Sequence, residues 1–195
     1  MRTKRLFGGL PVLQSDTLIL RAVSDDDFND LFDLYSNEKI YQYRPGVVRK
    51  TEEAVRKFLL QCNEEYERKE AVYYAVCMKS IPDTVVAVGE VFGIDSRLEM
   101  VNIGYSVREK FWGQGIATET VRILLKYLFD EIEVNRIQAH AMPENEPSNK
   151  VLQKSGLEKE GLIRQGALWS GKGVVDVNQY AILKEDYERE CEDKL

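Results

Sequence analysis

The sequence predicts an α+β fold in which helices pack on a mixed β-sheet, and three observations support this prediction. Two segments with helical spacing of apolar residues come before a series of short apolar runs, which have the length and residue types of strands. A helical segment then links the third of these strands to a fourth. That connection is long enough for the two strands to lie parallel, whereas short turns join the earlier strands and favour antiparallel pairing. At 195 residues the chain has room for one substantial core, and we expect one domain over residues 15–188.

The first third of the chain is expected to hold an N-terminal arm, one strand and two helices. We expect residues 1–14 to be a mobile arm ahead of a strand over 18–21. Ser24 precedes three aspartates, which suits a helix start, and helical spacing of apolar residues follows. A loop rich in tyrosine and charge comes next over 37–50, and Thr51 then begins a second helix with an apolar face.

Strands dominate the rest of the chain. Turn residues near Ser80 and Asp95 divide three expected strands into an antiparallel meander. Apolar residues recur at i, i+3, i+4 and i+7 from Val121, which gives the next helix one stripe for packing on a sheet. The expected elements are strands at 72–78, 85–94 and 101–107, a helix at 118–129, a strand at 136–141, a helix at 145–155 that ends at Gly156, a hairpin of 157–168 and 174–183, and a tail at 189–195.

A glycine-containing run lies between the strand over 101–107 and the helix that follows it. Gly113 and Gly115 permit a tight turn and a close approach of backbone N–H groups to a ligand. The start of the helix adds unpaired N–H donors and the positive end of a dipole. Together these features predict a site for a phosphate or pyrophosphate, although a plain strand-to-helix turn would use the same glycines.

Composition excludes several other classes of protein. The net charge is −6, and no basic run interleaves with aromatic residues, so a dedicated nucleic-acid binder is not expected. With three scattered cysteines, no Cys-x-x-Cys and one histidine, no Cys/His metal site is expected. The sequence has neither a signal peptide nor an apolar run of membrane-spanning length, so we expect a cytoplasmic protein that does not enter a membrane.

Two well-known phosphate-binding motifs do not fit the glycine run. A P-loop needs Lys and Ser or Thr after its last glycine, whereas Ile116 and Ala117 follow Gly115. A dinucleotide-binding turn should follow the first strand of its unit, and the next strand should end with an acidic residue. Here the next strand ends at His140 and Ala141, and several elements precede the turn.

The run instead resembles the signature of the GNAT acyltransferase superfamily, [Gln/Arg]-x-x-Gly-x-[Gly/Ala] at the start of a central helix. Trp112 stands where Gln or Arg is usual. A second set of residues looks like the branch that contains the RimJ/RimL ribosomal-protein N-terminal acetyltransferases, and the resemblance covers about 15–188. The matching residues are Leu18-x-Leu20-Arg21, Trp112-Gly113-Gln114-Gly115-Ile116-Ala117, Asn145-x-x-Ser148, Val151 to Leu157, Glu160-Gly161 and Asp176-x-x-x-Tyr180-x-x-Leu183.

This resemblance implies acetyl-CoA as the donor, held where the strands over 101–107 and 136–141 splay apart. The pantetheine arm would pair with one strand, and the pyrophosphate would lie on the N–H groups of the glycine run, with Arg108 as a charge partner. A backbone N–H near Val107 would stabilise the oxyanion. The implied cofactor-binding residues are Tyr105, Ser106, Val107, Arg108, Gly113, Gln114, Gly115, Ile116, Ala117, Thr118, Asn145 and Lys154.

The same resemblance suggests the catalytic residues. Ser148 would protonate the leaving thiolate, although Asn145 and Ser148 also suit the first turn of a helix as capping residues. Glu90 and Glu160 are the candidate general bases for the amine, with a water chain as the alternative. Glu90 would otherwise be a residue on the solvent face of an alternating strand. His140 is left out of the mechanism as a packed or hydrogen-bonded strand residue.

The acceptor is expected on the opposite side, between the loop over 37–46 and the final hairpin. Tyr41, Tyr43, Arg44 and Tyr180 are the candidate substrate contacts, although a buried core tyrosine and an ordinary amphipathic loop explain them equally well. The expected reaction transfers an acetyl group to a primary amine, first of all the N-terminal α-amine of a ribosomal protein. The alternatives are a small-molecule amine as acceptor, a non-catalytic acyl-CoA-binding module and a nicotinamide-dependent reductase. A homodimer is one expected assembly.

Overall fold

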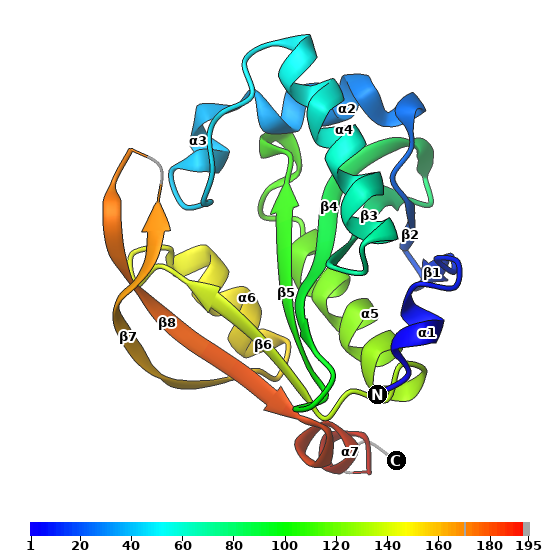
Figure 1. Ribbon diagram of the computed structural model, residues 1–195, viewed down its shortest axis with the longest axis vertical. Helices are drawn as coiled ribbons and strands as arrows, with labels where there is room; N and C mark the ends of the chain where they lie inside the picture. Colours follow the sequence, from blue (N-terminus) through cyan, green and yellow to red (C-terminus); the bar gives the residue numbers. More distant parts are fainter. Residues whose placement is uncertain (170, 193–195) are drawn as a thin grey trace.

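Eight strands form one sheet in the order β1-β2-β3-β4-β5-β6-β8-β7 (Figure 1). The structure is a computed structural model that describes residues 1–169 and 171–192. Neighbouring strands are antiparallel except for β5 and β6, which are parallel. The strands are β1 (Leu13–Gln14), β2 (Leu18–Ala22), β3 (Ala71–Met78), β4 (Ile81–Asp95), β5 (Met100–Val107), β6 (Arg136–Ala141), β7 (Glu158–Trp169) and β8 (Gly173–Leu183). The predicted α+β class with a mixed sheet is confirmed.

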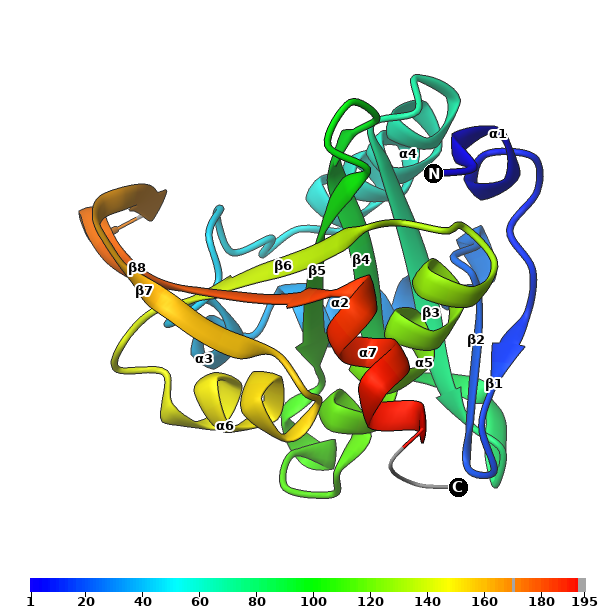
Figure 2. The ribbon, with the colours of Figure 1, turned by 90° about the horizontal axis from the view of Figure 1, so that it is seen from below.

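Helices cover both faces of the sheet (Figures 1 and 2). Ala75 and Cys77 of β3 belong to a buried cluster with α2 and α4, whereas the alternate residues Tyr74 and Val76 belong to the main core, which includes α5. This alternation follows from the two-residue period of a strand. The helices are α1 (Thr3–Leu6), η1 (Asp25–Asp27), α2 (Phe28–Tyr35), α3 (Glu38–Tyr41), α4 (Glu52–Glu67), η2 (Glu109–Phe111), α5 (Ile116–Asp130), α6 (Glu146–Lys154) and α7 (Lys184–Glu192).

The long helices form for reasons visible in their sequences. The Thr51 side chain caps α4 by accepting a hydrogen bond from the Ala54 N–H at 3.2 Å, and Glu52 and Glu53 follow in the first turn, where the helix dipole favours acidic residues. The apolar stripe that begins at Val121 is buried along α5, as predicted. Burying that stripe against the sheet is what fixes α5 and the turn before it.

The pairing between β5 and β6 stops after three residue pairs. Met100, Val101 and Asn102 pair with Arg136, Ile137 and Gln138, and the two strands then diverge. Each strand keeps its other neighbour: β5 stays paired with β4 as far as Val107, and β6 stays paired with β8 as far as Ala141. The splayed central strands that the family resemblance implied are therefore present.

Several element predictions need correction. Residues 1–14 are not a mobile arm, because Leu6 is fully buried in the main core and the Arg2 N–H donates to the Ile132 carbonyl at 2.6 Å. The expected loop over 37–50 contains α3, and α5 starts at Ile116, two residues before the prediction. The turn before β4 is shorter than expected, since Ile81 already pairs with Met78. Helix α7 covers 189–192 of the expected tail, and 193–195 lie outside the described residues.

Candidate active site

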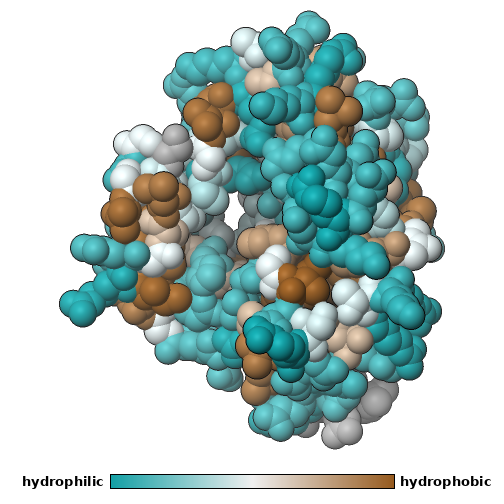
Figure 3. Space-filling model, in the orientation of Figure 1, coloured by the Kyte–Doolittle hydropathy of each residue, from teal (hydrophilic) through white to brown (hydrophobic). Residues whose placement is uncertain are grey.

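A cleft of about 720 Å³ opens where β5 and β6 part. Figure 3 shows the molecule hollowed between the lobe of β7 and β8 and the rest of the protein. Residues 103–107 of β5 and 139–141 of β6 form its two strand walls. The turn before α5 and the start of α6 line one end, and the segment after α3, with Glu90 and Trp169, lines the other.

The turn before α5 has the geometry of an anion site. Gly113 and Gly115 have φ values of +75° and +81°, which disfavour any residue with a side chain. A Cβ built at either glycine meets nothing within 4 Å, so both backbones face open space. Gly115 is the N-cap and provides no side-chain cap, which leaves the first N–H groups of α5 available to a ligand. Gly113, Gln114, Ile116 and Ala117 line the cleft, and an anionic phosphate group fits this backbone.

Trp112, which stands where the family signature has Gln or Arg, ties the turn to the strand. Its indole N–H donates to the Val107 carbonyl at 2.6 Å, while 46% of the residue remains exposed. The side chain therefore holds the turn before α5 against the end of β5.

Ser148 lies in the cleft and forms a hydrogen bond with Tyr105. The two hydroxyl oxygens are 2.8 Å apart, and Tyr105 comes from β5 whereas Ser148 lies in the first turn of α6. Burial raises the pKa of Tyr105 to about 12, against the opposing effect of its bond to Ser148, so this hydroxyl stays protonated at neutral pH. Asn145 caps α6 by accepting from the Ser148 N–H at 3.2 Å. The capping interpretation of this pair is correct, and it leaves the Ser148 hydroxyl directed at Tyr105.

Glu90 forms an ion pair with Arg44 at the other end of the cleft. The Arg44 Nη2 lies 2.6 Å from Glu90 Oε1, and both side chains are mostly buried. Gly104 pairs with Glu90 across the β4–β5 ladder, and a Cβ at Gly104 would lie 3.3 Å from Glu90 Oε2. The missing side chain at Gly104 therefore makes room for the carboxylate on this face of β5.

The geometry argues against Arg108 as a partner of the pyrophosphate. Arg108 is 6% exposed, and its guanidinium binds Asp30 at 2.6 Å and Asp33 at 2.7 Å, both on α2. It also donates to the Val85 carbonyl at 2.8 Å. Two carboxylates and a carbonyl occupy this cation, so its role is to join the end of β5 to α2 and β4.

The geometry also argues against Glu160 as a base. Its carboxylate lies on β7 outside the cleft lining and forms two hydrogen bonds with the Arg136 guanidinium, at 2.7 and 2.5 Å. The bonds to Arg136 lower the pKa of the Glu160 carboxyl, which makes it a weaker proton acceptor.

Two tyrosines expected at the acceptor end also point elsewhere. Tyr41 is buried and accepts a hydrogen bond from Arg49, and Tyr180 is buried and donates to Asn149 at 2.8 Å. Neither lines the cleft, nor do Thr118 and the exposed Lys154. Gly115, Arg108 and Glu160, which are described above, do not line it either. The predicted site residues that do line the cleft are Tyr43, Arg44, Glu90, Tyr105, Ser106, Val107, Gly113, Gln114, Ile116, Ala117, Asn145 and Ser148.

Sequence reasoning missed Phe92 and Gly104 as cleft residues, placed Trp169 only on the hairpin that bounds the acceptor side, and left out His140, which is exposed and lines the cleft. Phe92 and Gly104 share a face with Glu90, so strand alternation was the signal that pointed to them. Trp169 lines the cleft from the end of β7, and the predicted hairpin at the acceptor side was the signal that pointed to it.

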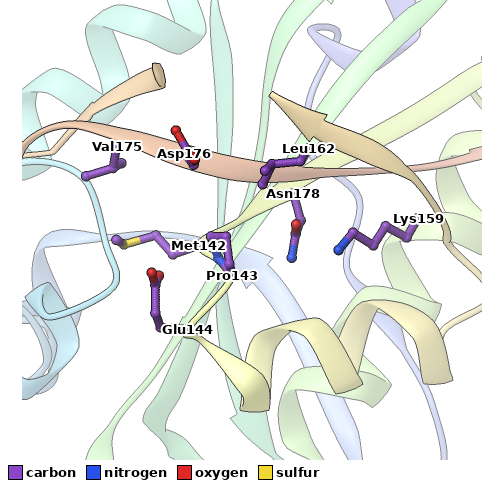
Figure 4. Close-up of a pocket in the computed structure, with 8 residues that line it drawn as sticks. All are labelled: Met142, Pro143, Glu144, Lys159, Leu162, Val175, Asp176 and Asn178. Atoms are coloured by element: carbon purple, nitrogen blue, oxygen red, sulfur yellow. The ribbon is translucent and has the colours of Figure 1, made fainter. Parts of the chain in front are cut away.

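A second cavity of about 540 Å³ lies between the segment that follows β6 and the β7–β8 hairpin. Figure 4 shows Glu144 on the side of α6 and Asp176 on β8. Asp176 accepts a hydrogen bond from the Gln165 N–H at 2.7 Å, and the Asn178 amide donates to Asn149 at 2.8 Å. The first contact joins the two strands of the hairpin, and the second joins the hairpin to α6.

Within the described parts of the chain, no group of three or more His, Cys, Asp or Glu side chains is arranged to hold a metal ion. Across the same residues, no helix is both long enough and apolar enough to span a bilayer.

The parted sheet and the open glycine turn that lines its cleft are the features expected of an acyltransferase. Residues 17–158 match the family model described as an acetyltransferase (GNAT) domain, so the chain belongs to the GNAT acetyltransferases. It is accordingly an acyltransferase with N-acetyltransferase activity.

Similar proteins match most of the chain. The chain is 30% identical over 183 residues to the Bacillus subtilis protein named "Probable N-acetyltransferase YjcK", covering 91% of this chain and 100% of that protein. It is 24% identical over 164 residues to the Escherichia coli [Ribosomal protein uS5]-alanine N-acetyltransferase, covering 82% and 84% of the two chains. The structure of Mycobacterium smegmatis RimJ in complex with CoA-disulfide has the same fold, with a TM-score of 0.79, 22% identity and coverage of 90% and 87%.

Replacement of Arg108 tests its assignment as a structural cation. Arg108→Met should lower the free energy of unfolding by about 3 kcal/mol, because it leaves Asp30 and Asp33 without their partner, and it should leave the affinity for CoA within about twofold of wild type. Urea denaturation and calorimetric CoA titration measure the two quantities. Arg2→Met is the matched control, since it breaks an exposed pair with Glu133 outside the cleft and should cost much less. A stable Arg108→Met protein with tenfold weaker CoA binding would contradict the assignment.

Proposed function

We propose that this protein transfers the acetyl group of acetyl-CoA to the N-terminal α-amine of a protein, of the kind found in ribosomal proteins. The observation that carries the proposal is one cleft that joins the phosphate-binding turn before α5 to Ser148 and, beyond it, to Glu90. A donor with a phosphate-rich end and a reactive thioester end matches this arrangement. The name of the E. coli relative, an alanine N-acetyltransferase of ribosomal protein uS5, supports the choice of acceptor.

Acetyl-CoA would supply an activated acyl group, and the chain would supply its position. The N–H groups at the start of α5 would hold the pyrophosphate, with no protein cation required there. The backbone of residues 103–107, which has lost its pairing with β6, would pair with the pantetheine arm. Such pairing would bring the thioester to the point where Ser148 and Tyr105 meet.

The side chains at that point are suited to the proton transfers of the reaction. Glu90 would accept a proton from the ammonium of the acceptor, directly or through water, because only the neutral amine attacks the thioester carbonyl. As the C–N bond forms and the C–S bond breaks, the nitrogen would lose its second proton to water, and the Ser148 hydroxyl would donate a proton to the departing thiolate. Tyr105, still protonated, would return a proton to Ser148 through their 2.8 Å hydrogen bond, and water would then restore the proton of Tyr105. A backbone N–H near Val107 would stabilise the oxyanion.

The first test is binding of the donor. Acetyl-CoA and CoA should raise the melting temperature, and NAD and ATP should raise it less, because a ligand that binds only the native state stabilises it. Gly115→Glu should abolish the CoA shift, since it places a carboxylate in the anion site. Gly9→Glu is the control, because Gly9 also has a positive φ of +116° and open space at its Cβ but lies outside the cleft. A CoA shift that persists in Gly115→Glu would contradict the pyrophosphate assignment.

Removal of the proposed acid should slow the chemical step alone. Ser148→Ala should lower kcat by about 100-fold, the usual size of a general-acid effect, with the Kd for acetyl-CoA within about twofold of wild type. Ser155→Ala serves as the control, because Ser155 lies in the same helical segment and bonds to the Val151 carbonyl. Steady-state rates and calorimetric titration separate the two effects, and an unchanged kcat would remove Ser148 from the mechanism.

The two candidate bases can be separated by their pH profiles. Glu90→Gln should lower kcat/KM by at least tenfold near neutral pH and remove the acidic limb of its pH dependence, because glutamine cannot accept the amine proton. Glu160→Gln should keep both, since its carboxylate is bound to Arg136. A wild-type profile for Glu90→Gln would show that water or another group removes the proton.

A further inference from the structure

We propose that the acceptor carries a carboxylate close to its amine and that Arg44 binds this carboxylate. The inference rests on the proposed function and names the substrate class of the same site. It starts from the two ends of the acceptor: Glu90 is suited to the ammonium, and a cation lies next to Glu90 in the same cleft.

Arg44 has hydrogen-bond donors that the protein leaves unused. A guanidinium offers five N–H groups, and one of them, on Nη2, binds Glu90 at 2.6 Å. The Nε atom is buried and has no hydrogen-bond partner among the described residues. The side chain is 18% exposed and its guanidinium carbon lies 5.3 Å from the centre of the Tyr35 ring, which holds the cation in place. An arginine fixed in this way favours a planar, bidentate partner such as a carboxylate.

Trp169 provides a second unmet donor on the opposite wall. Its indole N–H is buried without a partner in the described part of the chain, and the residue lines the same cleft. Tyr43, the neighbour of Arg44 in sequence, packs against the cluster of Met142, Trp169 and Val177, so the segment after α3 meets the hairpin here. Buried donors without hydrogen-bond partners are costly. A carboxylate on the substrate would accept hydrogen bonds from the Arg44 Nε–H and the Trp169 indole N–H once the two side chains adjust around it.

Charge at this end of the cleft favours the same class of substrate. Lys172 in the hairpin turn lies 4.9 Å from the centre of the Tyr43 ring, so a second cation lies against the residue that precedes Arg44 in the sequence. Two cations lie here although the whole chain has a net charge of −6. A polyamine would bring further positive charge to them, whereas an amine with a neighbouring carboxylate would bring one group for Glu90 and one for Arg44.

The ion pair also couples acceptor binding to the proposed base. While Arg44 binds Glu90, part of the carboxylate is occupied by that cation. A carboxylate on the acceptor would share the guanidinium and leave Glu90 beside the incoming ammonium. The acceptor would thereby prepare the group that takes its proton.

Matched acceptors test the inference, with acetylation followed by release of the CoA thiol. One pair is a peptide that begins Ala-Asp and its Ala-Asn analogue; the other is free alanine and alaninamide, and spermidine represents the polyamines. We expect the carboxylate member of the preferred pair to have at least tenfold higher kcat/KM, and spermidine to be the poorest substrate. The faster pair identifies whether the carboxylate belongs to a peptide or to a free amino acid.

Variants assign the preference to Arg44. Arg44→Gln should reduce the difference between the paired acceptors to about twofold, and Trp169→Phe should reduce it in part. Arg49→Gln is the matched control and should keep the full preference, because Arg49 also lies 5.3 Å from the Tyr35 ring but does not line the cleft. If Arg44→Gln fails to fold, the wild-type comparison and Trp169→Phe decide the question.

Two results would overturn the inference: equal kcat/KM values for the paired acceptors in the wild type, or a preference that persists in folded Arg44→Gln. Either result leaves the proposed function standing, since products still form. Absence of acetylation of every amine, with acetyl-CoA bound, would instead overturn the proposed function and this inference with it.

Discussion

The parting of β5 and β6 is the constraint on which the rest of this structure depends. Parallel strands normally satisfy each other's backbone groups along their whole length, but here the pairing ends at Asn102 and Gln138. The sheet stays intact because β4 and β8 hold the outer edges of the two strands. The inner edges are left with unused donors and acceptors that face a cleft, which is the requirement for binding an extended ligand between them.

Strand alternation divides the cleft into two chemical environments. Tyr105 points to the face that carries α6, where it meets Ser148, whereas Gly104 lies opposite Glu90 on the other face. Consecutive residues of β5 therefore serve the two halves of the proposed reaction. The glycine is as important as the tyrosine, since a side chain at position 104 would fill the space that the Glu90 carboxylate uses.

Local patterns in the sequence predicted most of the fold and the tight turn before α5. The apolar stripe from Val121 and the backbone conformation of Gly113 and Gly115 depend on neighbours a few residues away, so both could be predicted from the sequence. The structure argues against the predicted roles of Arg108 and Glu160, because both side chains bind partners that are distant in the sequence. Arg108 binds carboxylates 75 and 78 positions earlier, and Glu160 binds a guanidinium 24 positions away. No local pattern in the sequence predicts such pairing. The burial of Leu6 could not be predicted for the same reason, because its core neighbours are distant in the sequence.

The cleft is lined by residues from both faces of the sheet, and under the proposed function this arrangement lets two substrates bind at once. The turn before α5 and α6 contribute one part of the lining, and the segment after α3 and the hairpin contribute another. Donor and acceptor would then be present together, so direct transfer would need no acylated side chain to carry the group between them. The proposed acceptor side is built from a connecting segment and an edge hairpin, which are the parts of a fold that change most readily. New acceptors could therefore arise during evolution while the proposed donor side stays as it is.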